Sequence, residues 1–240
     1  MRALTLLITG LVAGCISLSG GAHPKQVTWR LEQAGSIGGH GVEVLGSPEP
    51  RAMNGRKALC FDGQADGLLL DVNPIEGWPQ FTVEILLIPD GDAPEEQRFL
   101  HIEDDQQHRL LMETRVNKER TWSLDTFLHN TKDHRLTLLD RTMVQPADQW
   151  YWAALVYDGK AMGQYVNGVK LLEGPVEFLP MSRGKISLGV RQNRIHWFKG
   201  CIAEVRFTPI ALTKLQRIDA PSSAAVAPSR NRVNSSRPTP

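Results

Sequence analysis

The chain has 240 residues with 27 basic and 26 acidic side chains, which gives a formal net charge of +1. A charge so close to neutral provides no electrostatic reason to expect nucleic acid as a partner. The length allows one large β-sandwich or two small domains. The 21 glycines and 15 prolines favour many turns, and 41% hydrophobic residues suffice for a full core.

Residues 1–22 are predicted to be a targeting segment. Arg2 precedes an apolar stretch over 3–13 that is too short to span a bilayer comfortably. The stretch ends in VAGC, which resembles the lipobox of bacterial lipoproteins and implies lipidation and membrane attachment through Cys15. The alternatives are a secretory signal cut after Ala22 and a retained anchor. All three export the protein, so we expect an envelope lipoprotein (periplasm, outer membrane or cell surface) or a secreted protein.

Residues 23–57 mix strand-like runs with glycine-rich turns and are expected to pack on the body of the protein. That body, 58–218, reads as short strands separated by turn signals, which is typical of an all-β sandwich or barrel. Only 211–218 could form a helix, and 219–240 reads as a disordered tail. The predicted strands are 58–61, 67–72, 81–88, 99–103, 109–116, 121–129, 135–139, 185–190 and 201–208.

The stretch 150–172 predicts an antiparallel meander. Three apolar runs are separated by Asp158-Gly159 and by Asn167-Gly168. Both dipeptides favour two-residue hairpin turns, whose central residues take positive φ.

Several short motifs follow one another along the body of the chain: FDG with Asp66, FTVE, LVYDG, YVNG, ISLG, and WFKG-x-IAEVRF followed by Ala211-Leu212. In this order they resemble laminin G-like domains, which are concanavalin A-like folds. The resemblance implies a two-sheet antiparallel jelly-roll sandwich, a fold that hosts lectins, adhesion domains and some glycanases and so leaves function open.

The cysteines support export. If Cys15 is lipidated or removed, Cys60 and Cys201 remain as an even pair in an oxidising compartment. In the family that the chain resembles, the first and last strands lie side by side, which implies a Cys60–Cys201 disulfide. Two buried free thiols are the alternative.

Alternation along the strands places charged residues on sheet faces. Glu113 and Arg115 share one face of their strand, Asp125 lies on a polar face of the next, and Glu204 and Arg206 do so near the end. Arginine and carboxylate groups can hold sugar hydroxyls in a polysaccharide groove. The alternative is a solvated face with cross-strand ion pairs, each worth roughly 0.2–1 kcal/mol.

The loop GVRQNRIHWFKG is the second candidate for binding. It carries Arg191, Asn193 and Trp197, and an indole can stack on the apolar face of a sugar. Trp197 could equally cover the edge of the core.

Catalysis and metal binding have weaker signals. The Glu-x-Asp-x-x-Glu motif of laminarinase-type hydrolases and the Gln-x-His motif of alginate lyases are missing, although Glu113 and Asp125 could form a carboxylate pair. The histidines lack metal-site spacing, so no zinc site is predicted. Calcium is the one cofactor considered, with Asp62, Asp66 and Asp104-Asp105 as candidate ligands.

The leading hypothesis is an exported, lipid-anchored, non-catalytic module that binds a glycan. The rivals are a polysaccharide-cleaving enzyme using Glu113 and Asp125, and a protein-binding adhesion or envelope-assembly domain. The oligomeric state is not predicted. The expected ligand-binding residues are Glu113, Arg115, Asp125, Arg191, Asn193 and Trp197.

Overall fold

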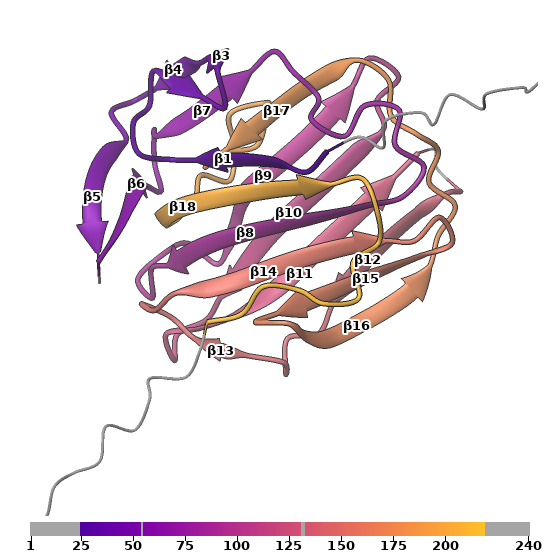
Figure 1. Ribbon diagram of the computed structural model, residues 1–240. Helices are drawn as coiled ribbons and strands as arrows, with labels where there is room; N and C mark the ends of the chain where they lie inside the picture. Colours follow the sequence, from indigo (N-terminus) through magenta and orange to yellow (C-terminus); the bar gives the residue numbers. More distant parts are fainter. Residues whose placement is uncertain (1–24, 54, 131–132, 219–240) are drawn as a thin grey trace, which may run out of the picture.

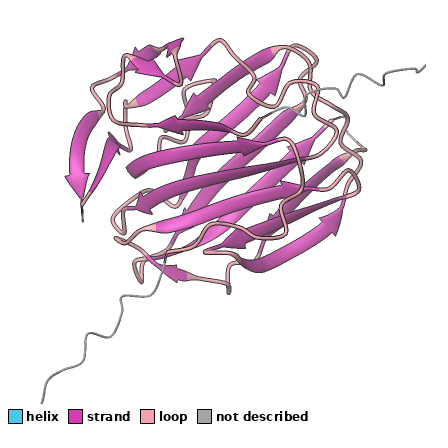
Figure 2. Ribbon diagram, viewed as in Figure 1, coloured by secondary structure: helices cyan, strands magenta, loops and turns pink. Residues whose placement is uncertain are grey.

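A computed structural model describes residues 25–53, 55–130 and 133–218. The predicted signal segment with Cys15 and the predicted tail, 219–240, lie outside the described residues. Strands and connecting loops account for all of the described part, as Figure 2 shows. No helix in these three ranges is long and apolar enough to cross a membrane.

The strands form two large antiparallel sheets. The strands are β1 (Val27–Arg30), β2 (Ser36–Ile37), β3 (His40–Gly41), β4 (Glu43–Leu45), β5 (Glu49–Met53), β6 (Arg56–Asp62), β7 (Gly67–Leu70), β8 (Phe81–Pro89), β9 (Glu96–Asp104), β10 (Arg109–Val116), β11 (Thr121–His129), β12 (Arg135–Leu139), β13 (Gln145–Pro146), β14 (Tyr151–Tyr157), β15 (Ala161–Val166), β16 (Val169–Pro175), β17 (Gly184–Leu188) and β18 (Lys199–Thr208).

One sheet, here called the β8 sheet, has the order β16-β15-β14-β8-β18-β6-β5, with β1 also paired to β18. The other, the β10 sheet, has the order β12-β11-β10-β9-β17-β7-β4, with β13 also paired to β11. The β8 sheet lies in front of the β10 sheet in Figure 1. The two-layer jelly-roll sandwich expected from the sequence is confirmed.

The core fills the space between the two sheets. Leu110 and Met112 of β10 and Trp122 and Leu124 of β11 are buried there. Because successive side chains of a strand point to opposite faces, the residues between them lie on the outer surface of the β10 sheet. Alternation therefore settles which side chains of these strands can meet a ligand.

The predicted meander is β14, β15 and β16. Asn167 and Gly168 have φ values of 48° and 75°, and Gly159 has 92°. Positive φ at both central residues gives the Asn167-Gly168 turn the twist that a two-residue hairpin needs.

The predicted helix over 211–218 does not form. The segment 209–218, here called the strap, instead runs back across the outer face of the β8 sheet, as the yellow trace after β18 shows in Figure 1. Its backbone N–H groups donate hydrogen bonds to side chains of the sheet. Leu212 N–H donates to Thr82 Oγ1 (2.9 Å), and Gln216 N–H donates to Glu84 Oε1 (2.7 Å). These bonds replace the internal hydrogen bonds that so short a helix would have to form by itself.

The Cys60–Cys201 disulfide is confirmed, with an S–S distance of 2.03 Å. The two cysteines are directly opposite each other on β6 and β18. They lie in a second apolar cluster, on the outer side of the β8 sheet, with Trp150, Trp152 and Leu86. The alternative of two free thiols is excluded.

Candidate functional site on the β10 sheet

The outer face of the β10 sheet carries a hollow of about 260 Å³. Its floor comes from neighbouring strands in register, because Phe127 is opposite Leu111 and Asp125 is opposite Glu113. The residues lining it are Arg98, Arg109, Leu111, Glu113, Arg115, Asp125, Phe127, Thr137 and Arg191.

An ion-pair network forms one end of this hollow. The Arg115 guanidinium donates to Glu113 Oε2 (2.8 Å) and to Asp125 Oδ2 (2.5 Å), and it also lies 3.0 Å from Glu96 Oε1. Arg98 contacts Glu96, and its Nε lies 3.0 Å from Glu113 Oε1. The Glu113 and Asp125 side chains are only 4% and 3% exposed, so the arginines cover them. The surface that a ligand meets here is therefore guanidinium rather than carboxylate.

Burial changes the protonation of these carboxyl groups. Loss of solvation, together with the nearby charge of Asp125, raises the pKa of Glu113 to about 7. Burial also raises the pKa of Asp125, against the effect of its hydrogen bond from Arg115. For Glu96, partial burial is outweighed by hydrogen bonds from Arg115 and Arg98, which lower its pKa to about 2. Glu113 is thus the group of this network that exchanges a proton near neutral pH.

An apolar strip lies beside the network. Phe127 is half-buried and belongs to neither apolar cluster, and its ring stacks on that of His129 with 5.9 Å between centroids. Leu111 and Thr137 are its direct neighbours on β10 and β12. A partly exposed aromatic ring on a sheet surface, flanked by hydrogen-bonding groups, is suited to stacking against a sugar.

The loop 189–198 forms the wall of the hollow on the β9 and β17 side. Gln192 N–H donates to His101 Nδ1 (3.3 Å), and its side-chain amide donates to the Lys185 carbonyl (2.8 Å). Burial lowers the pKa of His101. These contacts attach the loop to the sheet and position Arg191 at the rim.

Four of the six residues predicted to bind ligand line this one hollow: Glu113, Arg115, Asp125 and Arg191. Asn193 and Trp197 do not line it. Asn193 is exposed on the loop, and the Trp197 indole lies against the backbone of Gly67, where a Cβ would come within 3.4 Å of it. Trp197 therefore covers the edge of the sandwich.

Sequence reasoning missed five lining residues: Arg98, Arg109, Leu111, Phe127 and Thr137. Alternation could have found Phe127 and Arg109, since Phe127 is two residues from Asp125 and Arg109 four residues from Glu113, and an even spacing puts residues on the same face of a strand. It could not have found Arg98, because an irregularity in the β9–β10 pairing between Met112 and Glu113 changes the phase of alternation.

The second predicted polar face is on the β8 sheet. Arg206 Nε donates to Glu204 Oε1 (2.5 Å), and its guanidinium lies 4.8 Å from the centre of the Trp152 ring. Burial raises the pKa of nearby Glu84. The strap crosses this face and bonds to Thr82 and Glu84, so the chain itself covers it.

The candidate calcium ligands are engaged by backbone donors. Asp62 Oδ1 accepts from Gln64, Ala65 and Asp66 N–H groups at 2.8–3.0 Å. Asp104 accepts from Gln106, His108 and Ser182. No group of three or more His, Cys, Asp or Glu within the described ranges could hold a metal. The carboxylates shape turns here.

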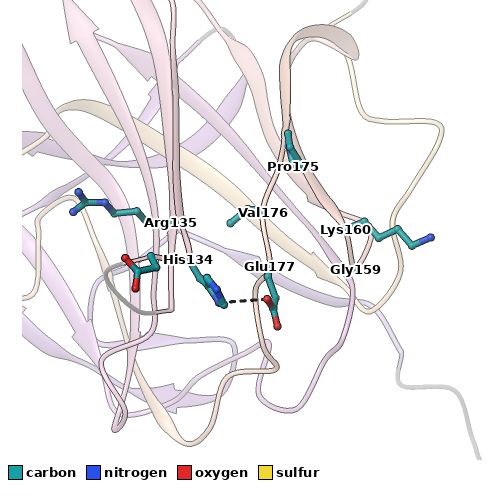
Figure 3. A pocket seen from close by; sticks show the side chains of 8 residues that line it. His134, Arg135, Gly159, Lys160, Pro175, Val176 and Glu177 are labelled. Carbon is teal, nitrogen blue, oxygen red and sulfur yellow. Dashed lines mark ion pairs between the residues drawn. The ribbon is translucent and has the colours of Figure 1, made fainter.

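A different hollow of about 450 Å³ lies between β12 and the segment after β16 (Figure 3). Its ion pair joins His134 Nδ1 to Glu177 Oε2 over 3.4 Å, and these side chains are 44% and 66% exposed. Among the described residues that line it, His134 is the one aromatic side chain. Its groups are mostly solvated, so the hollow on the β10 sheet is the better candidate.

A family model described as the concanavalin A-like lectin/glucanases superfamily, of laminin G type, matches residues 62–216. The chain belongs to this superfamily. No curated protein matches it in sequence.

Solved structures support the same fold. Domain 4 of AbnA, an extracellular arabinanase of family GH43 from Geobacillus stearothermophilus, in complex with arabinotriose, is 20% identical with a TM-score of 0.61, covering 79% of this chain and 94% of that one. The binding domain of Paraclostridial Mosquitocidal Protein 1 is 12% identical (TM-score 0.59), and the match covers 78% of this chain and 49% of that one. The binding domain of botulinum neurotoxin DC in complex with SialylT is 11% identical (TM-score 0.55), covering 78% and 48%. The chain thus spans about half of each toxin domain. At these identities the likeness concerns the fold alone.

Proposed function

We propose that this protein is a lectin-like, glycan-binding module whose site is the hollow on the β10 sheet. The observation that carries the proposal is Phe127, an aromatic side chain that lies on the outer face beside Arg109 and Arg115 and packs into neither apolar cluster. Sugars bind to such surfaces through ring stacking and planar hydrogen-bonding groups. The arabinotriose complex of the similar arabinanase domain supports a saccharide as ligand on this fold.

The export and lipid anchor expected from VAGC form part of the proposal. The Cys60–Cys201 disulfide supports an oxidising compartment, since such bonds persist mainly outside the cytosol. Labelling cells with a radioactive fatty acid tests the anchor: label should enter the wild-type protein and be absent from Cys15→Ser.

The first prediction concerns Phe127. We expect Phe127→Ala to weaken glycan binding by about tenfold or more, because one stacked ring contributes roughly 0.5–1.5 kcal/mol beyond the area that it buries. A glycan array followed by calorimetry on the best ligand measures the effect.

Trp197→Ala is the matched control, since it removes a larger aromatic ring that lies outside the hollow. Equal loss in both variants, or no binding of any plant, algal or bacterial glycan by the wild type, would contradict the proposal.

Polysaccharide cleavage is the second candidate. Glu113, with a pKa of about 7, faces Asp125 across β10 and β11, and a carboxyl group that keeps its proton at neutral pH is suited to act as a general acid. Against this role, both carboxylates lie beneath Arg115, which a substrate would have to displace. Release of reducing ends or unsaturated products by the wild type, lost in Glu113→Gln, would establish it.

A further inference from the structure

The arginines of the hollow fall into two groups. Arg98 and Arg115 are held by Glu96, Glu113 and Asp125. Arg109 and Arg191 are not held in this way, because no carboxylate in the described part of the chain lies within ion-pair distance of either.

Arg109 illustrates the second group. Its Nε is buried without a hydrogen-bond partner among the described residues. The carboxylate of the residue opposite it on β9, Glu103, lies instead 3.3 Å from His101 Nε2. A buried guanidinium nitrogen without a partner costs the molecule free energy. Arg109 as a whole is only half-buried and lines the hollow, so its charge is within reach of a ligand.

The residues that line the hollow carry an excess of positive charge. Four guanidinium groups, of Arg98, Arg109, Arg115 and Arg191, line it against the carboxylates of Glu113 and Asp125. Glu96 and Glu103 adjoin it, and the charge of Glu103 acts on Arg109 and Arg191. With all four acids ionised the charges balance, and one positive charge is left when Glu113 holds its proton. Burial and the charges of Arg98 and Arg109 lower the pKa of Arg191, against the opposing effect of Glu103 and Glu113.

The geometry points to a glycan that carries a negatively charged group. We propose that Arg109 and Arg191 contact a sugar carboxylate or sulfate while the ring rests on Phe127, which is opposite the buried Leu111. Arg109 is two residues from Leu111 on β10, roughly 7 Å along the strand, within reach of an acidic substituent on a ring at that position. The inference rests on the proposed function and names the class of ligand for the same site.

The test uses pairs of polymers that differ in charge. Calorimetry in about 0.15 M salt compares polygalacturonate with its methyl ester, and dextran sulfate with dextran. We expect the wild type to prefer the charged member of at least one pair by about tenfold or more, and the preferred pair distinguishes carboxylate from sulfate. The double variant Arg109→Gln/Arg191→Gln should lose this preference.

The control variant is Arg30→Gln/Arg56→Gln, which removes the same charge from exposed positions on the β8 sheet. It should keep its affinity within about twofold, as expected for exposed charges that are screened at this ionic strength. Equal loss in both double variants would show general charge attraction and overturn the inference.

The remaining outcomes separate the two proposals. Binding to a neutral glycan that depends on Phe127 but shows no preference for charge would overturn the acidic ligand and leave the glycan-binding function standing. Absence of binding to every polymer and to the array would overturn both. The wild-type comparison within each polymer pair needs no variant, so it decides the question even where a substitution impairs folding.

Discussion

Arg115 stabilises two carboxylates that strand pairing places opposite each other. Glu113 and Asp125 would repel if both were ionised, and one guanidinium donates to both. Removing one member would leave buried charge uncompensated, so the network is suited to fixing side-chain positions. The arginines are thereby fixed in place as donors at the floor of the hollow.

The raised pKa of Glu113 has a consequence for stability. Its pKa is about 7 in the folded protein and 4.5 by reference, so between these values the folded state holds a proton that the unfolded state has lost. Stability must therefore fall as the pH rises from about 4.5 to 7 and level off above. We expect Glu113→Gln to remove this pH-dependent loss. From pH 5 to pH 8, the free energy of unfolding of the variant should therefore rise by up to about 3 kcal/mol relative to that of the wild type.

Urea unfolding at the two pH values measures this gain. Glu96→Gln is the control, because the pKa of Glu96 is lowered to about 2, so between pH 5 and pH 8 it is fully ionised in the folded state and mostly ionised in the unfolded state, and it adds little pH dependence there. If the free energies of unfolding of Glu113→Gln and the wild type differ by the same amount at pH 5 and pH 8, the protonation that we assign to Glu113 is wrong.

At the scale of elements, the Thr82 hydroxyl anchors the start of the strap. Thr82 Oγ1 donates to the Ile210 carbonyl (2.8 Å) and accepts from Leu212 N–H (2.9 Å). We expect Thr82→Val to release the strap locally and to reduce global stability by about 1–2 kcal/mol. Hydrogen exchange should accelerate at the amides of Leu212 and Gln216 before the core strands change.

Thr208 provides the matched control for that prediction. It is directly opposite Thr82 on β18, and its buried hydroxyl has no partner among the described residues. Thr208→Val removes the same atoms and should leave exchange in the strap unchanged. Equal acceleration in both variants would mean that Thr82 does not anchor the strap.

Elements differed in how well the sequence predicted them. β10, β11 and β12 begin and end at the residues predicted, because alternation and turn signals are local. The prediction of a helix over 211–218 was wrong, because N–H groups of this segment donate to Thr82, Glu84 and Asn167, more than 50 residues away in sequence. No local pattern reveals those partners.

At the scale of the whole molecule, the disulfide closes nearly the entire sandwich. Cys60 and Cys201 are separated by 141 residues, and in the chain-entropy description closing so long a loop stabilises the fold by about 5 kcal/mol. We expect Cys60→Ala/Cys201→Ala to lose most of this free energy of unfolding in urea. Wild-type protein unfolded with a reductant should behave as the variant does, and a loss under about 1 kcal/mol would show that packing alone holds β6 against β18.

The sequence by itself determined the β class, the meander turns, the faces of β10 and β11 and the family, because period-2 alternation and positive-φ dipeptides act over a few residues. It also indicated Glu113, Arg115, Asp125 and Arg191. Only the tertiary structure decided that these four line one hollow with Arg98, Arg109 and Phe127, and that Trp197 lies outside it. Strand order, the irregularity opposite β9 and the placement of the 189–198 loop arise from contacts between distant residues, which local periodicity cannot encode.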